Sequence, residues 1–95
     1  MQKDYEVFEP NNEHLARVIV RILEERGYRA GYQIGYPNNK VFITVDTKEE
    51  ADRISEIITK FMEKSNLTER GMTTDRFNKL TSKLGSLIPK TSKKA

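Results

Sequence analysis

The sequence contains no cysteine and no tryptophan, and it has a single histidine. Without cysteine the chain can form neither a disulfide framework nor a thiolate zinc site. No apolar run approaches the ~20 residues that a membrane-spanning helix needs, and the first ten residues lack the basic start and apolar core of a signal peptide. We therefore expect a cytoplasmic protein without a membrane span.

Few residues are suited to catalysis or metal binding. His14 has no cysteine or paired acidic group at the spacing of metal ligands. Glu49, Glu50 and Asp52 form an acidic cluster, but they stand at the start of an expected helix, where carboxylates complement the helix dipole. We therefore expect a protein that is not an enzyme and that has no metal site and no cofactor.

The composition is typical of one small globular domain. Of the 95 residues, 36% are hydrophobic and 33% are charged, which is enough for one modest core. Residues 1–70 carry 11 Lys and Arg against 13 Asp and Glu, whereas residues 71–95 carry 6 against 1. The last quarter of the chain is therefore basic, and it can be a solvated tail or a segment that attracts phosphates or an acidic protein surface.

The spacing of apolar residues predicts six elements in the order β-α-β-β-α-α. Strands are expected in 4–9, 28–36 and 41–45, and helices in 11–27, 47–66 and 73–89. Asn11 or Asn12 can cap the first helix, and Gly27 can close it. Thr47 and Glu50 have the spacing of a capping box at the second. The chain then divides into an α+β core domain (1–66), a connector with a C-terminal amphipathic helix (67–89) and a disordered basic tail (90–95).

Tyr28, Tyr32 and Tyr36 share one face of the expected hairpin with Ile34 and the apolar residues of the return strand. Because each of the first two helices has one apolar stripe, both must cover the same face of the sheet. The tyrosine face is the more apolar one, so we expect it to be the core face. The opposite face is then open, or it is covered by the third helix, a second copy of the domain or a nucleic acid; its expected residues are Phe8, Arg29, Gly31, Gln33, Gly35, Phe42 and Thr44.

The β-α-β-β-α order and the segment NNKVFITVDTKEEADRI (38–54) resemble an RNA recognition motif over residues 4–62. Of the basic and aromatic positions of that family's third strand, Lys40 and Phe42 are matched here. The resemblance implies a ferredoxin-like α+β sheet with two helices on one face, truncated because the fourth strand is missing. It also implies RNA binding on the open face.

Two functional hypotheses follow. In the first, the chain is a small nucleic-acid-binding protein, for RNA or single-stranded DNA. Aromatic rings on the open face stack on bases, and basic side chains neutralise phosphates; the residues are Phe8, Arg29, Phe42, Lys79, Lys83, Lys90, Lys93 and Lys94.

In the second hypothesis, the chain is a protein-interaction module such as an adaptor, an inhibitor or a dimerising subunit. Its contact residues are on the same open face and on the third helix, namely Phe77, Leu80, Leu84 and Leu87. Arg76, Lys79, Lys83 and Lys90 accompany this apolar stripe, so the helix could also lie on an anionic membrane. Docking on its own domain explains the stripe more simply.

Overall fold

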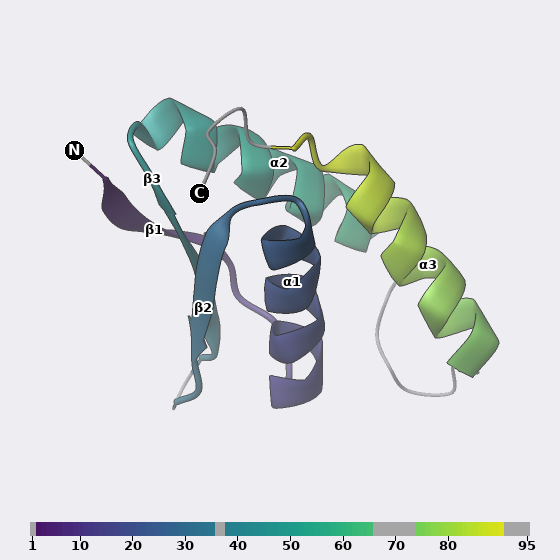
Figure 1. Cartoon of the computed structure of the whole chain (residues 1–95). Helices are drawn as coiled ribbons and strands as arrows, with labels where there is room; N and C mark the ends of the chain where they lie inside the picture. The colour runs from purple at the N-terminus through teal and green to yellow at the C-terminus, as the bar shows by residue number, and fades with distance from the viewer. Residues whose placement is uncertain (1, 36–37, 66–73, 91–95) are drawn as a thin grey trace.

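The computed structural model describes residues 2–35, 38–65 and 74–90. They form an α+β fold with the predicted order of elements (Figure 1), namely β1 (Lys3–Phe8), α1 (Glu13–Glu25), β2 (Arg29–Gln33), β3 (Lys40–Val45), α2 (Lys48–Ser65) and α3 (Thr74–Leu87). Residues 66–73, which include the predicted connector, and residues 91–95 of the predicted tail (90–95) lie outside the described residues.

The three strands form one antiparallel sheet in the order β1-β3-β2. β3 alternates strictly between half-buried and buried residues, and Val41, Ile43 and Val45 are the buried ones. In the register, Ile43 is paired with Tyr5 on one side and with Ala30 on the other. The face that carries Ile43 is therefore the core face, as the sequence pattern predicted.

Helices α1 and α2 both cover the core face, α1 over β2 and α2 over β1 (Figure 1). Asn12 caps α1, because its Oδ1 accepts a hydrogen bond from the amide of Leu15 at 2.8 Å. Gly27 follows the same helix with φ 94°, in the left-handed region that favours glycine. Thr47 Oγ1 accepts from the amide of Glu50 at 3.3 Å and so caps α2. The predicted cap at Asn12, the predicted closing glycine at Gly27 and the Thr47 half of the capping box are confirmed.

Helix α3 packs on α1 and α2 rather than on the sheet, on the side of α1 that faces away from β2 (Figure 1). Leu84 and Ile88 are fully buried and belong to the same core as the sheet residues. Arg26, just after α1, donates from its Nε to the carbonyl oxygen of Ile88 at 2.7 Å and ties the ends of the two helices together. No described helix covers the outer face of the sheet.

The tyrosine face is less completely buried than the pattern predicted. Tyr28 is 7% exposed, but Tyr32 is 38% exposed and Ile34 is 44% exposed. Tyr32 and Ile34 lie at and just beyond the end of β2, which is an edge strand whose last residue is Gln33. Tyr36 lies outside the described residues.

Candidate binding surfaces

The first candidate surface is the outer face of the sheet, here called the open sheet face. Its residues fall in register across the three strands. One row consists of Asp4, Thr44 and Arg29, and the next consists of Glu6, Phe42 and Gly31. Lys40 and Gln33 complete the face, which has Phe42 at its centre.

Charge on the open sheet face is balanced but separated. Asp4 and Glu6 are both on β1, whereas Arg29 is on β2 and Lys40 on β3, so the formal charge is zero. Lys40 Nζ lies 3.8 Å from Glu6 Oε1, and Thr44 donates a hydrogen bond to Asp4. Within the described residues, no carboxylate lies within salt-bridge distance of Arg29. One edge of the face is thus acidic and the other basic.

Beside the central Phe42, no side chain of the described residues covers the face on the β2 side, where Gly31 lies. A Cβ atom added to Gly31 would have no heavy atom within 4 Å. Gly31 is the direct partner of Phe42 across β2 and β3, so this flank of the half-buried ring lies beside bare backbone. A flat group from another molecule can therefore come close to the sheet here.

Phe8 is not on this face, which corrects the expectation that it lies beside Phe42. The register shifts between Glu6 and Phe8, so Phe8 pairs with Val41, whose side chain is on the core face. The ring packs against the edge of the core and lines a small hollow between β1 and α2. A β-bulge places an extra residue in one strand and so reverses the alternation that follows it.

The predicted phosphate-binding lysines lie away from the open sheet face. Lys79 and Lys83 are exposed on α3, and Lys90 is exposed just after it. Helices α1 and α2 separate α3 from the sheet. The structure therefore does not bring these lysines together with Arg29 and Phe42. Lys93 and Lys94 lie outside the described residues.

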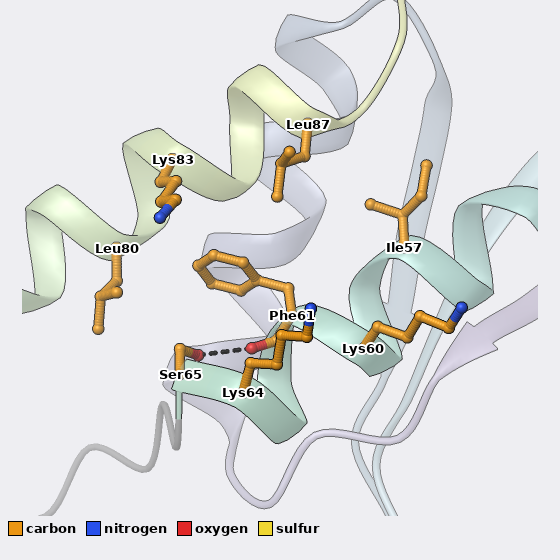
Figure 2. Close-up of a pocket in the computed structure, with 8 residues that line it drawn as sticks. All are labelled: Ile57, Lys60, Phe61, Lys64, Ser65, Leu80, Lys83 and Leu87. Atoms are coloured by element: carbon orange, nitrogen blue, oxygen red, sulfur yellow. Dashed lines mark hydrogen bonds between the residues drawn. The ribbon is translucent and has the colours of Figure 1, made fainter.

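The second candidate surface is a groove between α2 and α3, here called the α2–α3 groove, with a volume of about 470 Å³. Figure 2 shows Leu80 and Leu87 pointing from α3 toward α2, and Phe61 pointing from α2 toward α3. Ile57 completes the apolar part of the lining. Leu87 is 49% exposed, so the groove offers a leucine side chain that is not yet fully buried.

Three lysines surround this apolar lining: Lys60 and Lys64 from α2, and Lys83 from α3 (Figure 2). Lys60 Nζ lies 3.6 Å from Glu56 Oε2 in an exposed pair one helical turn apart. Lys64 and Lys83 have no carboxylate within salt-bridge distance in the described part of the chain. The groove therefore has an apolar floor and a cationic rim.

The predicted partner-binding residues of α3 divide into three groups. Leu84 is fully buried, so it holds α3 to the domain and is not available to a partner. Phe77 is half-buried on the α1 side of α3, with its ring centroid 5.5 Å from that of His14. Leu80 and Leu87 line the α2–α3 groove. Phe77 and Leu80 are half-buried, and Leu87 is the most exposed of the four residues.

Sequence reasoning missed the contribution of α2 to this groove. The sequence predicts that the second helix has one apolar stripe, but it does not single out Lys60 and Lys64 beside it. The only local signal of a cationic rim is the position of two lysines around Phe61: Lys60 directly precedes it, and Lys64 follows three residues later. Its meaning depends on Lys83, which lies far along the chain and reaches the groove only because α3 docks beside α2.

Tyr28 and Tyr32 have structural roles on the core side of the sheet. Burial raises the pKa of the Tyr28 hydroxyl above its ordinary 10.0, because the phenolate would be poorly solvated there. The Tyr32 hydroxyl accepts a hydrogen bond from Arg17 Nε at 3.1 Å, and this bond raises the pKa of Arg17. Neither ring is placed to stack on a base at the open sheet face.

In residues 2–35, 38–65 and 74–90, no cluster of three or more His, Asp or Glu side chains could hold a metal ion. None of the helices in these ranges is long and apolar enough to cross a membrane. Comparison of the chain with protein-family models, with curated proteins and with solved structures found no match.

Proposed function

We propose that this chain is a protein-interaction module that binds an acidic amphipathic helix of another protein in the α2–α3 groove. The observation that carries the proposal is the combination of an apolar floor with a three-lysine rim at one site. An amphipathic helix that lays its apolar face in a groove is a recurring mode of peptide recognition.

The geometry of the groove matches one face of a helix. Leu80 and Leu87 are two turns apart on α3, and Phe61 lies opposite them on α2 (Figure 2). Apolar side chains of a bound helix, spaced at i, i+3/i+4 and i+7, would fill the floor between these residues. Covering the half-exposed Leu87 would contribute about 1 kcal/mol, since full burial of a leucine is worth roughly 1.5–3 kcal/mol.

The lysines favour one sign of charge on the partner. Lys64 and Lys83 lie on opposite helices, so carboxylates on both flanks of a bound helix would each meet a cation. A basic or neutral helix would leave the rim without counter-charge. The apolar floor also distinguishes the groove from a surface that binds single-stranded nucleic acid. On such a surface the bases stack on exposed aromatic rings, whereas the exposed apolar side chain of this groove is the aliphatic Leu87.

Nucleic-acid binding stays a prediction. The open sheet face offers Arg29 and Phe42, but it also carries Asp4 and Glu6, which would repel phosphates. Lys79 and Lys83 are on α3, which packs on α1 and α2 and not on the sheet. A gel-shift titration with a mixed-sequence single-stranded oligonucleotide at low and moderate salt tests it, because phosphate binding weakens steeply as salt is added.

The test of the groove uses a designed peptide of roughly 18 residues, about five helical turns, with leucines on one face and glutamates on both flanks. Fluorescence anisotropy should show saturable binding to the full chain. Lys83→Glu should weaken binding at least about tenfold, or about 1.4 kcal/mol. Lys79→Glu, the same charge change on α3 outside the groove lining, should change it far less.

A second variant separates the apolar floor from the rim. Leu87→Asp replaces an exposed leucine, so the fold should survive, but the groove should lose its anchor. No binding by the wild type, or equal losses from Lys79→Glu and Lys83→Glu, would count against the proposal. Binding of the wild type to anionic vesicles but not to the peptide would point to a membrane surface instead.

A further inference from the structure

We infer that the open sheet face is a self-association surface that binds a second copy of this chain. The inference is independent of the α2–α3 groove, which lies on another side of the molecule. It rests on the arrangement of charge across the face and on the open space above Gly31, beside Phe42.

The charges at the two edges of the face are complementary to each other. Acidic side chains are on the β1 edge and Arg29 is on the β2 edge, with β3 between them. When two sheets stack face to face about a two-fold axis parallel to the strands, the β1 edge of each copy lies over the β2 edge of the other. Asp4 of one copy then faces Arg29 of the other, because the two residues occupy the same register row.

The other simple arrangement is disfavoured by the same charges. A two-fold axis perpendicular to the strands would place β1 over β1, so that Asp4 and Glu6 of both copies faced one another. Like charges brought together in an interface are costly. The first arrangement is therefore favoured, because it forms two Asp4–Arg29 pairs. It also brings the two Lys40 side chains near the axis, but each of them lies 3.8 Å from Glu6 of its own copy, which supplies a counter-charge. A two-fold interface requires a surface that is complementary to itself.

The centre of the face fits the same arrangement. A two-fold axis through β3 brings the Phe42 rings of the two copies together, where aromatic pairs prefer offset or edge-to-face contacts. Stacked sheets lie about 10 Å apart, so each ring needs space beside the opposing backbone. Gly31 provides it, because no atom lies within 4 Å of the position that a side chain there would occupy.

A copy of this chain suits the face better than a nucleic acid does. The formal charge of the face is zero, and its acidic edge would repel a phosphate backbone. The face has only eight residues, whereas stable complexes use roughly 20–30 residues a side. We therefore expect weak, concentration-dependent dimerisation.

A charge-swap experiment tests the inference by sedimentation velocity over a series of protein concentrations. The wild type should shift from monomer toward dimer as concentration rises. Arg29→Asp alone and Asp4→Arg alone should each weaken dimerisation at least about tenfold, because each places like charges opposite one another. The double variant Arg29→Asp with Asp4→Arg should restore it. Arg53→Asp, an exposed change on α2, is the matched control.

Each alternative outcome has a distinct meaning. A wild type that stays monomeric at all concentrations overturns the inference, as does a double variant that fails to recover while its circular dichroism spectrum matches the wild type. Tighter binding of a single-stranded oligonucleotide to Asp4→Arg, with no dimer in the wild type, would replace the inference with nucleic-acid binding at this face. Phe42→Ala should weaken the dimer without changing peptide binding in the groove.

Discussion

The same substitution, glycine to alanine, should have opposite effects at Gly85 and Gly27, which lie near the C-terminal ends of α3 and α1. Gly85 lies inside α3, where glycine costs about 1 kcal/mol relative to alanine. A Cβ atom built there lies 3.7 Å from Ile22 Cγ2 of α1, which is ordinary van der Waals contact and not a clash. Gly85→Ala should therefore stabilise the protein.

The expected gain is about 0.5–1 kcal/mol, because Gly85 is close to the C-terminal end of the helix, where propensity counts for less. In a domain of this size, 1 kcal/mol shifts Tm by roughly 4–8 °C. Gly27→Ala should do the reverse and cost about 1–2 kcal/mol, because φ at Gly27 is 94° and an L side chain is strained in that region. The two variants should thus melt on opposite sides of the wild type.

The measurement is thermal and urea unfolding, followed by far-ultraviolet circular dichroism. A lower Tm for Gly85→Ala would refute the reasoning. It would mean that the added methyl group clashes with Ile22, so that the two helices lie closer together than the distance of 3.7 Å between this Cβ and Ile22 Cγ2 indicates. Unchanged stability of Gly27→Ala would show that the end of α1 does not hold its left-handed turn in solution.

Three further predictions concern the core and its connections. Leu84→Ala should cost about 3–5 kcal/mol in urea unfolding, since Leu84 is fully buried between α3 and the rest of the core; a loss below about 1 kcal/mol would mean that α3 is not docked. Arg26→Met should cost about 1–2 kcal/mol, because the carbonyl of Ile88 loses a partly buried charged donor, and faster amide exchange near the end of α3 should accompany the loss. Burial raises the pKa of Tyr28 in the folded state above its ordinary 10.0, so the contribution of this group to stability is complete below pH 10 and is lost as the pH rises through the folded-state pKa. Tyr28→Phe should therefore reduce the fall in unfolding free energy between pH 9 and pH 11. An identical fall in both proteins would contradict the assignment.

The parts of the fold that depend on local spacing could be predicted from the sequence. The helical spacing of apolar residues predicted α1, and Leu15, Ile19 and Leu23, which have that spacing, are all in the core. The caps at Asn12 and Thr47 depend on neighbouring residues only, so they were predictable in the same way.

The failures depend on contacts between distant parts of the chain. Phe8 was placed on the wrong face because strict alternation cannot show a shift of register between β1 and β3. Ile34 was placed in the core because the pattern does not show where α1 stops covering β2. The lysine rim of the groove was missed because Lys64 and Lys83 are brought together only by the docking of α3.

The open sheet face and the α2–α3 groove lie in different directions from the shared core (Figure 1). Two copies joined through their sheets would therefore present both grooves outward, on opposite ends of one particle. Such a particle is bivalent, and a partner that carries two helices in tandem would bind the second at high effective concentration once the first is seated. Weak dimerisation would then produce tight bivalent binding, and dilution alone would abolish this avidity because it dissociates the dimer.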